Sequence, residues 1–306
     1  MVYHEIRRVN GKKHNYLIRN SRENGKWVKT SKYLGTGMIA REKLNDLKKE
    51  FEIELATEVK SECLLKQDFL RIEKLKTDYL KAMKSLSREE LEKFETHFFT
   101  ELTYNSNAIE GNSLSLEDTH LVLNEGLVPE GRTLREINEA RNHQKAIEFI
   151  KNYKGDLNEK LILKLHSIIL QGISERFAGR YRETPVRIFG ADVSFPSYEK
   201  VPQLIQNLIY WYKQNKNKMH PFELAVIFSM KFVSIHPFVD GNGRMSRLLM
   251  NFILNKNNYP WINIYHKQRA EYLKAVRKAN DEEYLPILRL TINLLQENLE
   301  KLGIKK

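Results

Sequence analysis

The chain has 306 residues, a formal net charge of +12 and 41% hydrophobic residues. This apolar content excludes a wholly disordered chain, and 14 Gly with 8 Pro exclude a collagen-like polymer. A single cysteine, Cys63, excludes an intramolecular disulfide framework and a cysteine-rich zinc module. The N-terminus lacks the apolar run of a signal peptide, and the longest apolar stretch, 223–235, is shorter than the roughly 20 residues that cross a bilayer. We therefore expect a soluble cytoplasmic protein.

Positive charge is concentrated at the N-terminus. Residues 1–36 hold nine Lys or Arg against two acids, which is a net charge of +7. Asn10-Gly11 lies between two short alternating segments and predicts a β-hairpin, and Asn24-Gly25 predicts a second turn. Tyr and Trp residues are interleaved with the basic ones. This arm is either a solvated basic hairpin or a docking surface for nucleic acid or an acidic partner, and the sequence leaves both interpretations open.

The pattern becomes helical from residue 39 onward. Capping boxes at Ser87 and Ser115 predict that helices start there. Further helices are predicted at residues 133–152, 158–172, 201–214, 221–235, 244–255 and 267–302.

One segment within this helical region alternates like a strand. Val186 and Ile188 flank a polar Arg187, and Gly190 follows in a predicted turn, so a small β-hairpin is expected over 186–195. The fold class expected is all-α with this hairpin and a β-rich arm in front. The expected division is a basic arm at 1–36, a helical connector at 37–98 and a core at 99–306.

Residues 236–247 contain the candidate catalytic and phosphate-binding residues. They read His-Pro-Phe-Val-Asp-Gly-Asn-Gly-Arg-Met-Ser-Arg. His236 can accept a proton near neutral pH, and Asp240 is an oxygen ligand suited to Mg²⁺. The segment 241–243 and the helix N-terminus that follows can hold a phosphate through backbone N–H groups.

Two arginines complete this segment. Arg244 and Arg247 are three residues apart, so a helix places them on one face, where two guanidinium groups can hold phosphates. Each part alone has an ordinary explanation as a structural histidine, a turn, a helix cap or a solvated face. Together a base, a metal ligand, an anion nest and two arginines suit a phosphoryl- or nucleotidyl-type transfer.

The segment resembles the Fic family, whose signature is HPFx(D/E)GNGRxxR, and every fixed position matches. The resemblance covers roughly residues 100–285 and implies the all-helical Fic fold and transfer of AMP from ATP to a protein hydroxyl. It implies that His236 is the catalytic base and that Asp240 binds Mg²⁺. The implied phosphate-binding residues are Gly241, Asn242, Gly243, Arg244 and Arg247. Gly243 stands where the kinase-like Doc branch has lysine, which favours nucleotidyl transfer over phosphate transfer.

Two further segments match parts of the family pattern. Residues 186–195 resemble the Fic flap, which pairs with an extended target segment by strand addition. The target-docking residues implied are Val186, Arg187, Ile188 and Phe189. Residues 268–280 resemble the region that lines the adenosine pocket, and the residues implied there are Tyr272, Leu273 and Asn280.

Residues 106–111 resemble the inhibitory motif (S/T)xxxE(G/N). Ser106 and Glu110 are four residues apart, so a helix places them on one face, and Gly111 is suited to end that helix. The position of this motif before the signature matches the Fic class with an N-terminal inhibitory helix. The resemblance implies that Glu110 pairs with Arg247 and takes the place of the γ-phosphate.

The sequence therefore predicts a self-inhibited protein adenylyltransferase that uses ATP and Mg²⁺ and modifies a Ser, Thr or Tyr hydroxyl of a target protein, which could include itself. Two alternatives stay open: a de-AMPylase that uses Glu110 on the same scaffold, and a nucleic-acid-associated regulator that acts through the basic arm. A homodimer fits the family. No winged helix is expected after the core, and no membrane partner is expected.

Overall fold

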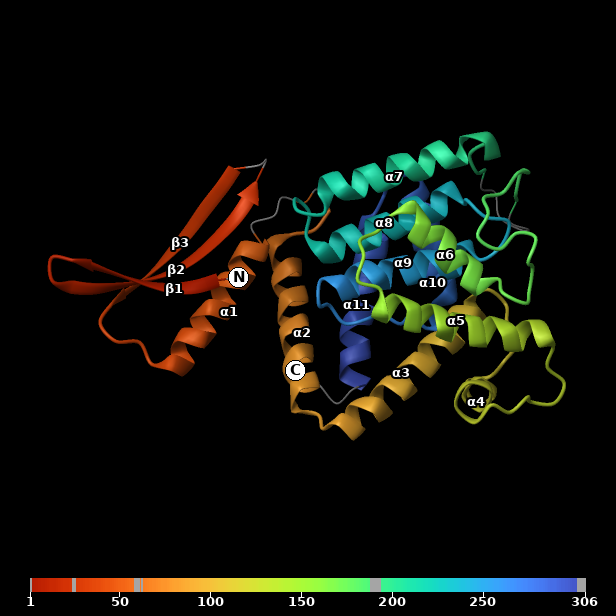
Figure 1. Cartoon of the computed structure of the whole chain (residues 1–306), viewed down its shortest axis with the longest axis horizontal. Helices are drawn as coiled ribbons and strands as arrows, with labels where there is room; N and C mark the ends of the chain where they lie inside the picture. Colours follow the sequence, from red (N-terminus) through yellow and green to blue (C-terminus); the bar gives the residue numbers. More distant parts are fainter. Residues whose placement is uncertain (1, 24–25, 58–60, 62, 188–193, 302–306) are drawn as a thin grey trace. The chain divides into compact units, whose positions relative to one another are not determined.

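The computed structural model describes residues 2–23, 26–57, 61, 63–187 and 194–301 (Figure 1). The chain divides into two compact units, the first made of residues 1–61 and 65–73 and the second of residues 62–64 and 74–306. In the part of the chain that is described, no helix is both long and apolar enough to cross a membrane.

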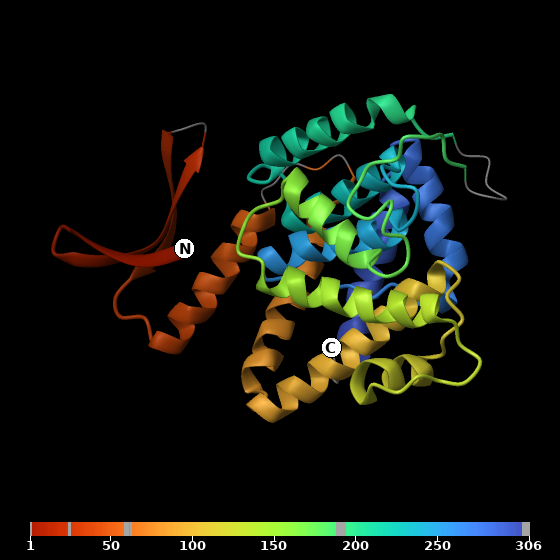
Figure 2. The same ribbon diagram turned by 45° about the vertical axis from the view of Figure 1, so that its right-hand side comes forward.

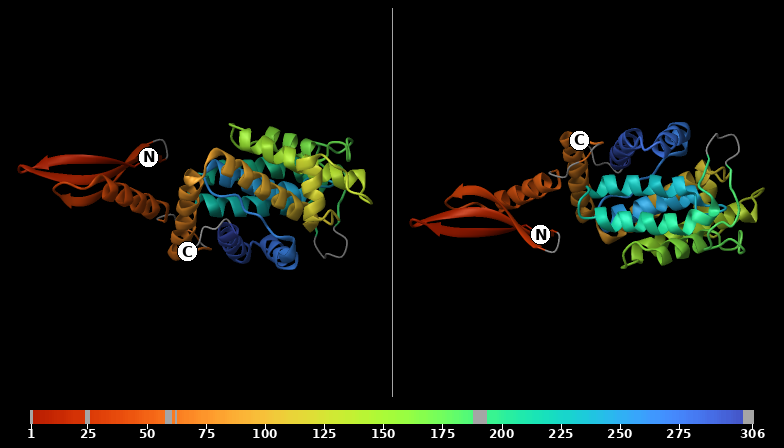
Figure 3. Two further views of the ribbon diagram at one scale, coloured as in Figure 1. Left: turned by 90° about the horizontal axis from the view of Figure 1, so that it is seen from below. Right: turned by 90° about the horizontal axis from the view of Figure 1, so that it is seen from above.

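The first unit is an antiparallel sheet with a helix on one face. Its strands lie in the order β1-β2-β3, and Asn10 and Gly11 form the β1–β2 turn with φ angles of 50° and 74°, as predicted. The other predicted turn, Asn24-Gly25, lies outside the described residues. Leu17 of the sheet packs on Phe51 of the helix, which lies along the sheet (Figure 3). The elements are β1 (Val2–Val9), β2 (Lys12–Glu23), β3 (Lys26–Thr36) and α1 (Arg41–Thr57). This sheet is the β-rich arm that the sequence predicts.

The second unit is helical. α2 (Lys66–Ser85) begins in the first unit and continues into the second. The α-helices that follow are α3 (Arg88–Ile109), α4 (Leu116–His120), α5 (Leu134–Asn152), α6 (Glu159–Ile169), α7 (Val201–Asn215), α8 (Pro221–Ile235), α9 (Asn242–Lys256), α10 (Arg269–Asn280) and α11 (Leu285–Lys301). A π-helical turn, Leu121–Glu125, extends α4, and two short 3-10 turns, Tyr198–Lys200 and His266–Gln268, precede α7 and α10.

The core of this unit is built on α8 and α9. α8 is apolar on almost every side, with Phe222, Phe228 and Phe232 fully buried, which is the pattern of a helix surrounded by others. α9 packs along it, α7 lies on its other side (Figure 3), and α5 and α6 pack on each other (Figure 2). The chain between α8 and α9 therefore lies at the end of the most buried helix pair, and it holds the motif of residues 236–241.

Most of the predicted helices are present within a few residues of their predicted bounds. Both capping boxes are confirmed, since the Ser87 and Ser115 side chains each accept a hydrogen bond from the third helical N–H and the acid at that position bonds back. The single helix predicted over 267–302 is wrong. The chain forms α10 and α11 with a break that includes Glu282 at φ 63°, because Pro286 fits the first turn of a new helix but not a helix interior.

Candidate active site

His236 ends helix α8 in a left-handed conformation, with φ 51° and ψ 59°. Pro237 follows and cannot continue the helix, so the chain turns sharply there. A non-glycine residue in this conformation costs roughly 1–2 kcal/mol and persists where the surroundings impose it. The imidazole Nδ1 lies 3.3 Å from the Val233 carbonyl oxygen. If Nδ1 carries the proton and donates it there, Nε2 is left as the free base.

Burial lowers the pKa of His236 to about 4. The carbonyl of Val233 acts against that shift, and the nearby Arg182 charge adds to it. The ring of Phe195 stacks on the imidazole with centroids 4.0 Å apart and contributes to its cover. His236 is therefore neutral at pH 7 and able to accept a proton.

Asn242 fixes the shape of the loop between α8 and α9. Its side chain accepts a hydrogen bond from the Phe238 N–H at 3.0 Å and donates one to the Phe238 carbonyl at 2.8 Å. The side chain is buried, so these two bonds satisfy both ends of the amide. The backbone N–H of Asn242 thus lies at the start of α9, while its side chain holds the preceding loop in shape through Phe238.

The N-terminus of α9 forms an anion site. Gly241 is the N-cap at φ 82°, a conformation that favours glycine, and the first N–H groups of the helix have no partner within it. The dipole of the helix favours a negative charge at this end. Arg244 and Arg247, both buried, project from the first two turns. Two buried nitrogens of Arg244, Nε and Nη1, make no hydrogen bond in the described part of the chain, although Nη1 lies 3.5 Å from the Glu139 carboxylate. These unpartnered donors fit an anionic ligand such as a phosphate.

Glu110 lies over this anion site. It caps the C-terminus of α3, and its Oε1 accepts a hydrogen bond from Arg247 Nη2 at 2.8 Å. Its carboxyl carbon lies 2.9 Å from the position that a β-carbon on Gly243 would occupy, so the carboxylate rests directly on the first turn of α9. Ser106, one turn earlier, accepts a hydrogen bond from Arg247 Nε at 3.0 Å. Burial on its own lowers the pKa of Arg247, but Glu110 and Tyr272 beside it raise that pKa overall.

The end of α3 is held in place by α10 and the turn before it. Arg269 donates a hydrogen bond from Nε to the Ile109 carbonyl at 2.8 Å. The His266 N–H donates to the Asn105 side chain at 2.9 Å. The structure therefore brings Arg247 to Ser106 and Glu110, from which it lies 141 and 137 residues away in the sequence, as the motif at 106–111 predicts.

Two buried residues that the sequence did not single out support the loop. His166 of α6 accepts a hydrogen bond from the Gly179 N–H at Nδ1, which leaves Nε2 to donate to the Asp240 carbonyl at 3.1 Å. Its ring stacks on Phe238 at 3.5 Å, and burial lowers its pKa to about 4.

Arg182 is the other supporting residue. Its guanidinium donates hydrogen bonds to the backbone carbonyls of His236, Thr184 and Pro196. Its backbone N–H donates a hydrogen bond to the Pro237 carbonyl at 2.9 Å. Arg182 thereby ties the loop to both ends of the segment 184–196. No motif marks these two residues, because their partners are backbone atoms distant in the sequence.

Comparisons with known proteins agree with this geometry. Residues 156–254 match the model of the Fic/DOC family. This stretch is therefore similar to a Fic domain. It is 32% identical over 201 residues to the protein adenylyltransferase Fic of Drosophila grimshawi, a match that covers 64% of this chain and 41% of that relative. The chain thus spans about two fifths of the length of the curated relatives it matches.

Solved structures place the fold in the same group. A Fic domain containing signaling protein from Bacteroides thetaiotaomicron aligns with a TM-score of 0.71 and 29% identity, over 77% of this chain and 97% of that one. Fic-1 from C. elegans aligns with a TM-score of 0.69 and 24% identity, over 86% of this chain and 77% of that one, which shows the fold alone. The helical core with its N-terminal sheet is thereby confirmed as a Fic fold.

Asp240 of the loop between α8 and α9 is engaged by three donors. Its carboxylate accepts hydrogen bonds from Arg135 at 2.8 Å, Arg244 at 3.1 Å and the Gly241 N–H at 2.5 Å. Among the described residues, no group of three or more His, Cys, Asp or Glu could hold a metal ion. One carboxylate with phosphate oxygens and water is a common setting for Mg²⁺. Asp240 therefore fits a magnesium ion that arrives with a nucleotide, provided that Arg135 leaves the carboxylate.

The three residues expected near adenosine are separated in the structure. Tyr272 is buried against Arg247, with the guanidinium 6.0 Å from the ring centre, and Leu273 is half-buried beside it in α10. Asn280 accepts a hydrogen bond from Ser234 at 2.6 Å and lines a cavity of about 290 Å³ together with Trp211.

The expected flap is described in part. Val186 and Arg187 are not in a strand, and Ile188 and Phe189 lie outside the described residues. The hairpin over 186–195 therefore stays a prediction. Phe195, at its C-terminal end, stacks on His236.

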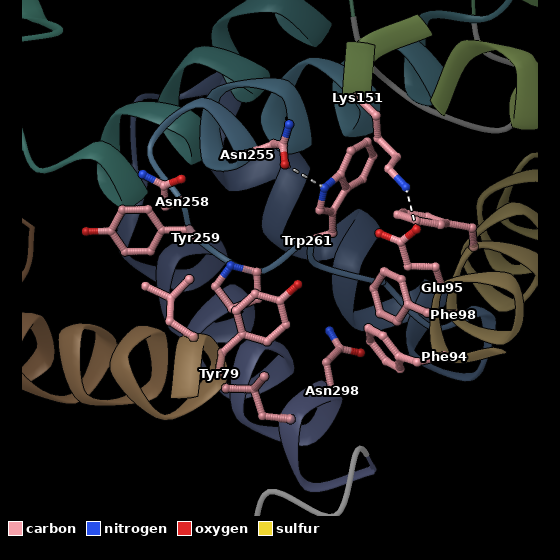
Figure 4. Close-up of a pocket in the computed structure, with 14 residues that line it drawn as sticks. Tyr79, Phe94, Glu95, Phe98, Lys151, Asn255, Asn258, Tyr259, Trp261 and Asn298 are labelled. Atoms are coloured by element: carbon pink, nitrogen blue, oxygen red, sulfur yellow. Dashed lines mark hydrogen bonds and ion pairs between the residues drawn. The ribbon is translucent and has the colours of Figure 1, made fainter. Parts of the chain in front are cut away.

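A second cavity lies elsewhere in the same unit (Figure 4). It measures about 160 Å³ and lies against the C-terminal end of α9, whereas the anion site lies at the N-terminal end. Phe94 and Phe98 of α3, Tyr79 of α2 and Trp261 line it, and Lys151 pairs with Glu95 at 2.7 Å at its edge. None of the predicted site residues lines this cavity, so we do not assign it to the reaction.

Proposed function

We propose that this protein is a self-inhibited adenylyltransferase that transfers AMP from ATP to a hydroxyl group of a protein. The observation that carries the proposal is the loop between α8 and α9, where a neutral His236 and a helix N-terminus with two buried arginines meet. The curated relatives named protein adenylyltransferase Fic support it. The target in this proposal is a Ser, Thr or Tyr side chain of another protein or of this chain.

His236 acts as the general base in this proposal. Its Nε2 takes the proton of the target hydroxyl while that oxygen forms a bond to the α-phosphorus of ATP. The bond between the α-phosphorus and the bridging oxygen breaks, and pyrophosphate leaves with the electron pair. The pKa of about 4 keeps His236 in the basic form at neutral pH.

The anion site holds the phosphates. In this proposal the N–H groups of Asn242 and Gly243 bind the phosphate oxygens, and the buried Arg244 adds positive charge at the same end of α9. Asp240 would hold Mg²⁺, which supplies positive charge beside those oxygens. Asn280 and its cavity suit the base of the nucleotide, because the asparagine amide can hydrogen-bond to the amino group and ring nitrogens of adenine.

Self-inhibition follows from the place of Glu110. A carboxylate on Arg247 and against Gly243 occupies the position and the charge that a distal phosphate needs. Two anions at one helix terminus repel each other, so ATP binds in this proposal with its phosphates displaced. Removal of the Glu110 side chain opens the site.

The test uses ATP labelled at the α-phosphate and, separately, at the γ-phosphate, with Mg²⁺ and the full chain. The variants are wild type, Glu110→Gly, Glu110→Gln and Glu110→Gly combined with His236→Ala. We expect α-label on protein, strongest in Glu110→Gly, intermediate in Glu110→Gln and absent without His236. Label from the γ-phosphate would overturn AMP transfer in favour of phosphate transfer. Release of AMP from a pre-modified protein, dependent on Glu110 and without forward labelling, would instead identify the enzyme as a de-AMPylase.

A further inference from the structure

The first unit has one sheet face covered by α1 and one that α1 does not cover. In an antiparallel sheet, paired residues share a face and neighbours along a strand alternate. Leu17 pairs with Lys32, and both belong to the covered face: Leu17 packs with Phe51, and Lys32 bonds to Glu54 of α1. Tyr16 pairs with Tyr33 and therefore belongs to the opposite face. We call this opposite face the aromatic face; its described members include Tyr3, Glu5, Arg7, Lys12, His14, Tyr16, Trp27, Lys29 and Tyr33.

Three aromatic rings on this face lie close together, and the exposed Trp27 lies apart from them near the start of β3. Trp27 is 74% exposed and Tyr33 is 50% exposed. The ring of Tyr33 lies 5.1 Å from that of Tyr16 and 5.7 Å from that of His14, and the Arg7 guanidinium lies 4.4 Å above Tyr16. The fully buried Ile18 shares this face, so the surface on which flat, apolar groups can stack consists of the exposed rings rather than the whole face.

The charge around the exposed rings is positive. Glu5 is the acidic residue among the described members of the face, and Arg7 and Lys29 both pair with it, at 2.6 and 3.1 Å. The Arg7 and Lys29 hydrogen bonds lower the pKa of Glu5, so its charge stays and is compensated. Arg8, Lys12 and Lys13 lie exposed at the nearby β1–β2 turn. A ligand that carries negative charge at regular intervals fits these basic residues at the edge of the aromatic face.

We propose that the aromatic face binds single-stranded nucleic acid. Unpaired bases present flat faces that stack on Tyr and Trp, while their phosphates lie near the lysines and arginines of the β1–β2 turn. A duplex hides the faces of its bases, and an acidic peptide has no flat groups to cover the rings. This binding is separate from AMP transfer and does not depend on it.

The experiment measures binding of the full chain to dye-labelled single strands of about 16 nucleotides, the upper range for one single-strand-binding module. RNA and DNA strands of mixed sequence are compared with a duplex of the same length and with heparin. The ring variants are Trp27→Ala, Trp27→Leu and Tyr33→Leu. The matched control is Tyr210→Ala, because Tyr210 is an exposed tyrosine of α7 in the second unit. Melting curves verify that each variant is folded.

We expect single strands to bind at least about tenfold more tightly than the duplex, because stacking contributes only where bases are free. Trp27→Ala should weaken binding about fivefold or more, Trp27→Leu should not restore it, and Tyr210→Ala should leave it unchanged. The logarithm of the affinity should fall linearly with the logarithm of the salt concentration. Equal affinity for single strand, duplex and heparin, unaffected by Trp27→Ala, would overturn the proposal and leave a general polyanion patch. Absence of binding at low salt would overturn it as well.

Discussion

Glu110 and Arg247, 137 residues apart in the sequence, form an ion pair of 2.8 Å directly above the N-terminus of α9. The arginine is buried, and the glutamate side chain is 39% exposed. The pair therefore joins a fixed cation to an anion with access to solvent. Of the two partners, Glu110 is the one that can leave the site without opening the core.

Replacement of Glu110 by glycine should raise AMP transfer by about tenfold or more. A charge-assisted hydrogen bond to a buried arginine is worth roughly 1.5–3 kcal/mol, and that free energy opposes the correct placement of the phosphates. The measurement is the rate of α-label incorporation at saturating ATP. Ser106→Ala serves as a milder control, since it removes one bond to Arg247 and keeps the carboxylate. Equal rates for wild type and Glu110→Gly would contradict self-inhibition.

Asn242 and Asn251 offer a matched pair on α9. Each is buried and bonds to both the N–H and the carbonyl of one residue outside α9, Phe238 for Asn242 and Ile262 for Asn251. Either replacement by alanine should destabilise the protein by about 2–3 kcal/mol, because a buried N–H and carbonyl lose their partners. Thermal unfolding checks this.

The two variants should differ in activity. Asn242→Ala frees the loop that carries His236 and Asp240, so transfer should fall further than the loss of stability explains. Asn251→Ala should retain transfer at temperatures where it is folded. The assay is made in the Glu110→Gly background, and a similar loss in both variants would argue against a special role for Asn242.

Acid should destabilise the protein through His166. Its pKa is lowered from 6.5 to about 4 by burial, so between these values the unfolded chain binds more protons than the folded one. The contribution of His166 to the free energy of unfolding is fully present above pH 6.5. It is lost as the pH falls toward 4, by an amount of the order of 3 kcal/mol.

His166→Gln tests this origin. Glutamine can accept from Gly179 and donate to the Asp240 carbonyl as the histidine does, but it does not titrate. Urea unfolding at pH 7 and pH 5 should show a smaller difference for the variant than for wild type. His143, whose burial and neighbouring arginines lower its pKa to about 3, should preserve part of the acid sensitivity.

Phe195 should control the basicity of His236. Burial is the largest cause of the lowered pKa of that histidine, and the Phe195 ring contributes to the cover. Phe195→Ala should therefore raise the pKa of His236 from about 4 toward 6.5, and Phe195→Leu should raise it less. Titration of the imidazole resonance by NMR measures this. An unchanged pKa of His236 in Phe195→Ala would show that other groups shield the imidazole from solvent.

The sequence predicts the site where neighbours along the chain build it. The loop at 236–243, the helix N-terminus and the arginine spacing all follow from local geometry, and the prediction that Glu110 meets Arg247 follows from the resemblance of residues 106–111 to an inhibitory motif. The parts it missed are made by tertiary packing. Arg182, His166 and Arg135 bind backbone or carboxylate atoms more than 50 residues away, and no local pattern marks such partners.

The fold was predictable for a similar reason. Capping boxes, an Asn-Gly turn and strongly periodic helices identify their own bounds. The division between α10 and α11 was missed although the polar run 280–283 interrupts the apolar pattern there, and Pro286 and the left-handed Glu282 mark the break in the backbone.

The anchoring of α3 has a consequence for how the inhibition is relieved. Arg269 and Asn105 fix the end of the helix, so displacement of the backbone would break several bonds in the core. Rotation of the Glu110 side chain breaks only its contact with Arg247, and such rotations are complete within nanoseconds. Under the proposed self-inhibition, basal turnover therefore reports the fraction of time that the Glu110 side chain spends away from Arg247. In this proposal, transfer activity varies continuously with whatever competes with Glu110 for Arg247, rather than changing between two fixed levels.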